Sequence, residues 1–178
     1  MLVTKGQLMA QKESLRLANI GYQLMDRKRM ILMQELSKLM DDVKALREVI
    51  DKAYDEAYLA LQRANVSYGV IDKIAQLIPI EDQVGIVYRS VMGIEIPKVS
   101  LEETPLEIPF ALSMSNSHLD EVYLKMRRVK YYTVMLAQMD TGMYRLAKAI
   151  EKSRKRANAL EKIVIPQLTT DIKIISDA

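Results

Sequence analysis

Two long stretches of the chain carry apolar residues at heptad spacing. In the first stretch, positions seven residues apart read Leu8, Leu15, Tyr22, Arg29, Leu36, Val43, Ile50, Ala57 and Ala64. A second row, three residues further on, reads Gln11, Ala18, Met25, Leu32, Leu39, Leu46, Ala53 and Ala60. Because a repeat of about 3.5 residues keeps one face of a helix against a partner, this pattern predicts a coiled-coil helix over about 4–77.

The second stretch repeats the pattern near the C-terminal end. One row reads Val122, Val129, Leu136, Met143, Ile150, Ala157 and Val164, and the row three residues later reads Lys125, Tyr132, Met139, Leu146, Ser153, Leu160 and Gln167. Beyond Pro166 the apolar positions continue as Leu168, Ile172 and Ile175. We therefore expect a helix over about 117–176 that kinks near Pro166 instead of stopping there.

The middle of the chain, over about 79–116, differs from both flanks. It contains Pro79, Pro97, Pro105 and Pro109, which exclude a long helix because proline removes a backbone donor. Short β-branched runs between glycine and proline make a β-hairpin possible over 84–96. The prediction is a mainly all-α fold. It is a long antiparallel two-helix coiled coil with a short irregular or β-hairpin middle segment, forming a single elongated domain over 1–178.

Composition narrows the class of protein. Apolar residues make up 49% of the chain and charged residues 28%, which is too apolar for a disordered tail. The chain has 12 Met, one Phe, and neither Trp nor Cys, so thin helix-on-helix contacts fit better than a broad core, and disulfides are excluded. It shows no signal-peptide pattern and no apolar run of about 20 residues. We expect a soluble protein that reaches a membrane only through partners.

The sequence offers little catalytic chemistry. It has no glycine-rich phosphate loop and no nucleophile motif. His118 is the single histidine and lies beside polar residues at an expected helix start, where a capping or solvent role is the usual one. The pairs Asp41–Asp42 and Glu102–Glu103 have no second cluster at metal-ligand spacing. We therefore expect a non-enzyme with no catalytic residue, no cofactor and no metal site.

Two groups of basic residues allow two interpretations of their role. The first group is Lys125, Arg127, Arg128 and Lys130, and the second is Lys148, Lys152, Arg154, Lys155, Arg156 and Lys162. They form either a solvated coiled-coil face, balanced by acids such as Glu151 and Glu161, or a positive surface that faces an acidic partner. Nucleic-acid binding is less favoured, since no set of stacking aromatics accompanies the charges and the net charge is only +3.

Two strings near the chain ends carry a family resemblance. Residues 16–29 read RLANIGYQLMDRKR, and residues 153–168 read SRKRANALEKIVIPQL. They resemble the patterns K-L-A-x-R-G-x-x-L-L-K-x-K-R and T-R-R-R-V-N-A-L-E-x-V-x-I-P-x-L of the D-subunit family of V/A-type ATPases. Residues 91–97, VMGIEIP, are similar to the family's central V-M-G-x-x-x-P segment. The chain departs from the family at Ile20, Ala157 and Gln167, which lowers charge and bulk there.

The resemblance implies a non-catalytic central-stalk rotor. Its expected partners are the catalytic and non-catalytic nucleotide-binding subunits of a head hexamer, a small stalk protein (the F subunit) and a cap subunit that leads to the membrane ring. It implies a cytoplasmic location at the membrane periphery, with neither membrane insertion nor nucleic-acid binding. The expected partner-contact residues are Arg154, Lys155, Arg156, Asn158, Glu161, Pro166, Arg16, Gly21, Lys28 and Arg29.

The heptad pattern alone also fits other proteins. A cytosolic coiled-coil scaffold shares the same periodicity without needing the two strings. The stalk of an export ATPase shares the geometry and differs in its partners.

Overall fold

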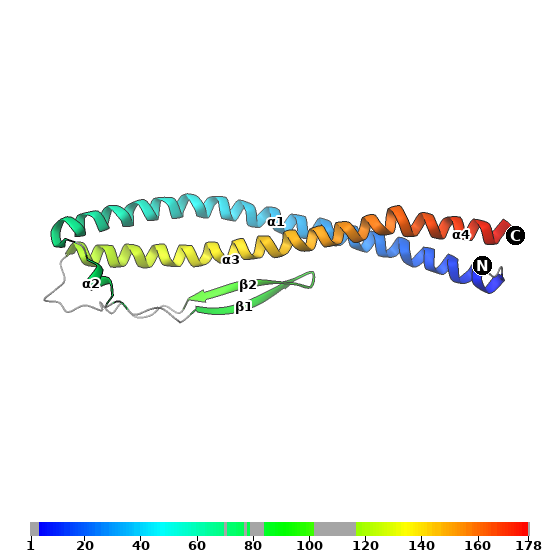
Figure 1. The fold of residues 1–178 in the computed structure, drawn as a ribbon, viewed down its shortest axis with the longest axis horizontal. Coiled ribbons are helices and arrows are strands. Elements are labelled where there is room, and N and C mark those ends of the chain that lie inside the picture. Colours follow the sequence, from blue (N-terminus) through cyan, green and yellow to red (C-terminus); the bar gives the residue numbers. More distant parts are fainter. Residues whose placement is uncertain (1–3, 70, 77, 79–83, 102–116, 178) are drawn as a thin grey trace. The chain divides into compact units, whose positions relative to one another are not determined.

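The computed structural model describes the whole chain except residues 1–3, 70, 77, 79–83, 102–116 and 178. Its elements are α1 (Lys5–Tyr68), α2 (Asp72–Ala75), β1 (Val84–Val91), β2 (Ile94–Leu101), α3 (Ser117–Ala159), the π-helical turn η1 (Leu160–Val164) and α4 (Ile165–Asp177). Figure 1 shows the long helices and the small two-stranded sheet. The predicted fold class, mainly helical with a middle β-hairpin, is confirmed.

Contacts divide the chain into two compact units. Unit 1 comprises Met1–Ser37, Val91–Ile94 and Tyr144–Ala178, and unit 2 comprises Lys38–Ser90 and Glu95–Met143. In each unit a part of α1 pairs with an antiparallel segment from the C-terminal half of the chain (Figure 1). Both chain ends belong to unit 1 and lie at the same end of that unit. A single elongated domain over 1–178 remains a prediction.

Local signals explain where α1 begins and ends. The Thr4 Oγ1 accepts a hydrogen bond from the Gln7 backbone N–H at 3.3 Å, which caps the free donors of the first turn. At the other end Gly69 adopts a φ of +76°, and its N–H donates to the Asn65 carbonyl at 2.8 Å. A left-handed glycine of this kind commonly terminates a helix. The helix therefore ends at Tyr68, whereas the sequence pattern predicted that it extends to about residue 77.

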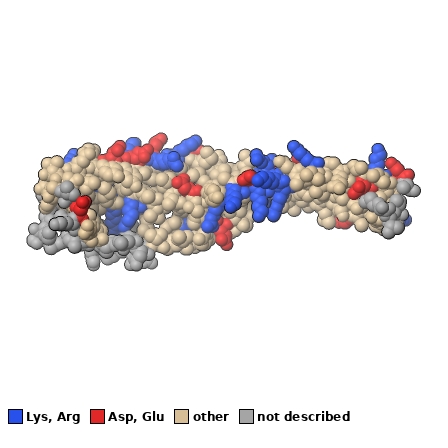
Figure 2. All heavy atoms as spheres, in the orientation of Figure 1, with Lys and Arg blue, Asp and Glu red and all other residues tan. Residues whose placement is uncertain are grey.

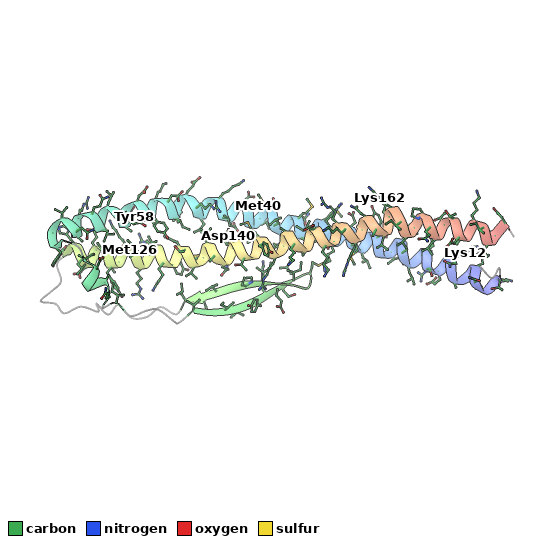
Figure 3. All side chains as sticks on the ribbon, viewed as in Figure 1. Lys12, Met40, Tyr58, Met126, Asp140 and Lys162 are labelled. Atoms are coloured by element: carbon green, nitrogen blue, oxygen red, sulfur yellow. The ribbon has the colours of Figure 1, made fainter. Side chains whose placement is uncertain are left out.

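The heptad rows are the least exposed stripe of both long helices. Every described row position of α1 is buried or half-buried, and the same holds for α3 and η1 up to Leu160 and Val164. Leu32 and Leu146 in unit 1 are fully buried, each with 0% exposure. In unit 2 small side chains replace them, and Ala60, Ala64 and Val122 form a cluster that Leu61 and Met126 cover. Figure 3 labels Met126 on α3. We call the stripe formed by the heptad rows of both long helices the seam.

A π-helical turn lies directly before Pro166, where the sequence predicts a kink, and the kink itself stays a prediction. Because proline has no N–H and its ring crowds the preceding turn, an α-helix is strained just before it. In η1 the Ile165 N–H instead donates to the Leu160 carbonyl, five residues back. This geometry accommodates one extra residue. The seam accordingly shifts by one position, because Gln167 is exposed while Leu168 is half-buried and Ile175 is buried.

The hairpin packs on the helices of unit 2 through β2. Ile96 is only 6% exposed, and the Val99 N–H donates to the Gln138 Oε1 of α3 at 2.6 Å. A Cβ on Gly142 of α3 would lie 3.1 Å from the Ile96 Cγ2. A side chain at position 142 would therefore press on Ile96 of the hairpin. The strands run to Leu101, five residues past the predicted hairpin end.

Candidate partner-contact surface

Unit 1 brings the N-terminal string (16–29) and the C-terminal string (153–168) side by side. A Cβ on Gly21 would lie 3.6 Å from the Leu160 Cδ1, an ordinary van der Waals distance. One residue further on, the Tyr22 hydroxyl donates to the Glu161 Oε1 at 3.5 Å. These two contacts join residues 139 positions apart in sequence. The two strings therefore form one continuous surface on the antiparallel helix pair.

A small polar group interrupts the seam at this level. The negative charge of Glu161, partial burial and the charge of Asp26 raise the pKa of Tyr22 above its ordinary value. The phenol thus stays protonated and able to donate. One turn from Tyr22 lies Asp26, whose Oδ1 is 2.6 Å from the Nη2 of Arg29, a further turn along the helix. The buried Nε of Arg29 makes no hydrogen bond within the described residues. Polar groups at seam positions favour one helix register over others.

Basic residues from both helices gather next to this polar group, and Arg29 belongs to both sets. Because the helices are antiparallel and Gly21 faces Leu160, positions 27–29 lie at the level of positions 152–156. The basic collar, as we name it, consists of Arg27, Lys28, Arg29, Lys152, Arg154, Lys155 and Arg156. Figure 2 shows a dense group of Lys and Arg side chains over α1 and α3.

Few acids neutralise the collar. Lys155 pairs with Glu151 at 2.6 Å, and Arg29 pairs with Asp26. Unit 1 as a whole contains 14 Lys and Arg but 7 Asp and Glu, a formal charge of +7, while the complete chain carries only +3. The basic character is therefore concentrated in unit 1, which favours an acidic partner for this surface.

The remaining candidate residues are mostly accessible. Arg16 is exposed, and its Nη2 lies 2.6 Å from the Glu13 Oε1, where it lowers the pKa of that carboxyl. Asn158 and Pro166 are exposed, Glu161 is exposed beside Tyr22, and Lys28 is half-buried. Gly21 is half-buried in the seam against Leu160. All ten predicted contact residues thus belong to unit 1. Their contact with a partner stays a prediction.

The outer face of α1 in unit 1 carries a second apolar stripe. Leu17 and Leu24 are each 57% exposed, and Ile20 and Ile31 are 41% and 42% exposed. Their spacing of three, four and seven residues places them together on one helix face, away from the seam. A coiled coil that faces only water carries mainly polar residues at such positions. We call these four residues the outer stripe, and they mark a surface suited to a protein partner.

Sequence reasoning missed three features of this surface. It did not foresee the Tyr22–Glu161 contact, the place of Arg27 in the basic collar, or η1. The one-residue offset between Gln167 and Leu168 signalled η1, since an inserted residue shifts a heptad row by one position. Among the described residues, no group of acidic or histidine side chains could hold a metal ion. No helix in the described ranges is long and apolar enough to cross a bilayer.

The fold and this surface define an antiparallel helical-hairpin protein that presents a basic and apolar surface where its two chain ends pair. Residues 7–178 match the family of ATP synthase D subunits, and the chain belongs to that family. It is 39% identical over 176 residues to the D subunit of a V-type ATP synthase from Thermotoga neapolitana, covering 98% of this chain and 87% of the relative. It is 30% identical over 177 residues to the D subunit of an A-type ATP synthase from Pyrococcus abyssi, covering 97% and 83%.

Proposed function

We propose that the chain is the central rotor shaft of a V/A-type rotary ATPase. In this role it transmits torque between a head hexamer of nucleotide-binding subunits and a membrane ring that translocates ions. ATP synthesis and ion transport then belong to the assembly, and this chain contributes no catalytic residue. Membership of the D-subunit family supports the assembly, since the relatives from Thermotoga and Pyrococcus carry that name.

One observation carries the rotor role. Unit 1 pairs both ends of the chain into a two-helix surface that combines the basic collar with the outer stripe. A scaffold coil that only holds itself together would not need exposed Leu and Ile opposite its seam. Met9 and Met30 are 67% and 49% exposed. Because methionine side chains are flexible and pack against differently shaped surfaces, they suit a shaft that contacts several different subunits as it turns.

The mechanism follows from asymmetry. A two-helix rod is not threefold symmetric, so at any angle it contacts each site of a surrounding ring differently. Such differential contacts bias each site toward its open or closed state. By linkage, the nucleotide state of the ring biases the angle of the rod to the same extent. Polar and ionic contacts hold the rod without locking it, because exposed ion pairs contribute only about 0–1 kcal/mol each.

The rotor-shaft role implies specific partners for each part of the chain. The basic collar and the outer stripe meet the catalytic and non-catalytic head subunits. The F subunit, a small stalk protein, binds alongside the rod, and a cap subunit links it to the membrane ring. The chain is then cytoplasmic and peripheral to the membrane, and it binds no nucleic acid.

The test begins with the complex in its source cells. The full-length chain is tagged and purified gently, and the co-eluting subunits and their ATPase activity are measured. The informative variant replaces Arg154, Lys155 and Arg156 together by alanine. The matched control replaces Lys38, Lys44 and Arg47, which removes the same charge from exposed positions of α1 in unit 2.

The rotor role predicts two large nucleotide-binding subunits and a small stalk protein in the wild-type eluate. The collar variant should lower the yield of assembled complex, or the ions moved per ATP, about tenfold, as expected for the loss of two or three charged contacts of about 0.5–1 kcal/mol each. The control should stay near wild type. Recovery of the chain alone, or rotation unaffected by the collar variant, argues against the role.

A further inference from the structure

A small hollow lies between α1 and α3 within unit 2. Its volume is about 160 Å³. The side chains that line it are Val49, Lys52, Ala53 and Glu56 of α1 and Lys125, Arg128 and Tyr132 of α3. All of them belong to unit 2, whereas the basic collar and the outer stripe belong to unit 1. The hollow is therefore separate from the surface that the proposed function uses.

A small residue at a seam position explains the hollow. Position 53 continues the heptad row that carries Leu39 and Leu46, but the residue there is alanine. A leucine would fill space between the helices that alanine leaves empty, and protein interiors are otherwise closely packed. Pockets for drug-sized ligands measure about 300–1,000 Å³, so a hollow of about 160 Å³ accommodates only a small chemical group.

The lining of the hollow carries a surplus of positive charge. Lys52, Lys125 and Arg128 oppose the single acid Glu56, which gives a formal charge of +2. Lys125 pairs with Glu121 at 2.8 Å, but an ammonium group has three donors, so this pair does not exhaust it. Among the residues that the structure describes, neither Lys52 nor Arg128 has an ion-pair partner. Two cations from facing helices thus border the hollow unneutralised.

The donor groups around the hollow match a phosphate group. The half-buried Tyr132 donates its hydroxyl to no described residue, so it adds a neutral donor to the cations. An arginine guanidinium offers a planar fork of donors that fits phosphate, and lysine offers a compact charge. A phosphate group carries about −1.5 to −2 charges near pH 7 and three strong acceptor oxygens. It therefore matches a lining of +2 better than a carboxylate, which carries one negative charge.

We infer that the hollow between α1 and α3 in unit 2 binds a phosphate group. Lys52 and Arg128 hold it from the two helices, and Tyr132 and Lys125 complete the set of donors. The group belongs either to free inorganic phosphate or to the terminal phosphate of a nucleotide whose nucleoside stays outside the hollow. Glu56 repels the ligand and keeps the affinity low. The inference does not depend on the rotor role, because the isolated chain contains the whole site.

A titration with inorganic phosphate tests the inference. Amide chemical shifts of the isolated, nitrogen-15-labelled full-length chain are followed while sodium chloride keeps the ionic strength constant. The shifts should saturate and concentrate at positions 49–56 and 125–132. The Kd should be about 1 mM, as expected for a few charged contacts that remain accessible to water. Shifts that do not saturate, or that chloride alone reproduces, overturn the inference.

Charge variants test which side chains hold the phosphate. Lys52→Gln with Arg128→Gln removes both unpaired cations and should weaken binding at least about tenfold. The matched control, Lys44→Gln with Arg47→Gln, removes the same charge from exposed positions of α1 outside the hollow and should stay within about twofold of the wild type. Equal affinities of the two double variants overturn the inference.

Glu56→Gln gives a prediction of opposite sign. The substitution removes the one acid that borders the hollow, so phosphate should bind about threefold more tightly. Weaker binding by this variant contradicts an anionic ligand and overturns the inference.

Ala53→Leu separates the hollow from its charge. Leucine fills the space while every charged side chain remains, so phosphate should bind at least about tenfold more weakly. Unchanged binding would show that phosphate meets only a charged surface, and it overturns the inference. Circular dichroism checks the helix pair, and the charge variants still decide the question if leucine disturbs it.

ADP and adenosine distinguish the two sources of the phosphate group. If ADP binds more tightly than inorganic phosphate while adenosine does not bind, the site takes the terminal phosphate of a nucleotide. If ADP binds more weakly than inorganic phosphate, the site takes the free ion. Adenosine that binds as tightly as ADP would show recognition of the nucleoside, and it overturns the inference.

Discussion

Gly142 offers the sharpest test of how the hairpin is held on α3. Glycine inside a helix costs about 1 kcal/mol relative to alanine, so it is kept where a side chain would obstruct packing. A Cβ here would lie 3.1 Å from the Ile96 Cγ2 and 3.6 Å from the Leu39 Cδ1. The first distance is too short by a few tenths of an ångström, whereas the second is ordinary. The obstruction therefore falls on the hairpin.

The sizes of the opposing free-energy terms decide whether each substitution at position 142 changes stability. Gly142→Ala gains about 1 kcal/mol of helix propensity and loses a similar amount where it presses on Ile96, so its net effect on unfolding is small. Gly142→Leu adds three more carbons at the same place, where overpacking costs about 1–3 kcal/mol or more. The hairpin is held by burial of Ile96, about 1.5–3 kcal/mol, and by one hydrogen bond of about 1 kcal/mol. The overpacking cost of leucine is therefore similar to most of the free energy that holds the hairpin on α3.

Amide exchange of Val99 reports on how the hairpin is held on α3, and circular dichroism reports on the helix itself. In Gly142→Leu the Val99 amide, which Gln138 protects in the wild type, should exchange at least about tenfold faster. Helicity by circular dichroism should be unchanged or slightly higher, because α3 itself gains propensity. Gly6→Leu is the matched control, since nothing lies within 4 Å of a Cβ there. A Val99 amide equally slow in Gly142→Leu and the wild type would show that the hairpin does not depend on this contact.

Three further predictions concern the helices. Deletion of Ile163 from η1 keeps the later seam positions in phase, so it should preserve the pairing in unit 1 and cost only the strain that η1 relieves before Pro166. Deletion of Lys148 rotates all later seam positions by about 100° and should abolish the pairing in unit 1, and thermal unfolding distinguishes the two deletions. Leu32→Ala empties a fully buried seam position and should cost about 2–5 kcal/mol in urea unfolding, while truncation of an exposed apolar residue costs less than about 0.5 kcal/mol. The hydrogen bond from Lys125 lowers the pKa of Glu121, so this pair stabilises the fold above the ordinary value of 4.5 and loses its effect as the pH falls through the lowered value; Lys125→Ala should weaken this acid sensitivity.

Much of the fold could be predicted because the heptad pattern is a direct record of burial. Arg29 and Gln11 break the rows, yet both are half-buried, since neighbouring positions on the same face set the orientation of the whole helix. The end of α1 was harder to predict. Apolar spacing continues past Tyr68, but Gly69 takes a left-handed conformation and stops the helix. A single glycine hardly changes the apolar periodicity of a sequence, but its backbone conformation can end a helix.

Contacts between distant segments were beyond the sequence. The bond between Val99 and Gln138 joins residues 39 positions apart, and neither residue belongs to a recognisable pattern. The turn at Met92–Gly93 was also unexpected, because methionine rarely adopts a positive φ. For the candidate surface, the basic residues could be found from sequence. The register that brings 27–29 level with 152–156 required the structure.

The antiparallel pairing in unit 1 has a consequence for synthesis of the chain. Tyr22 and Glu161 are 139 residues apart, so the first helix leaves the ribosome long before the segment that covers its seam. At about 5–20 residues per second, this delay is about 7–28 s. In unit 2 the bond between Tyr54 and Thr133 spans only 79 residues. Pairing can thus start in unit 2 as translation proceeds, and the apolar face of α1 in unit 1 is covered last, beginning near Leu32 and ending toward the N-terminus.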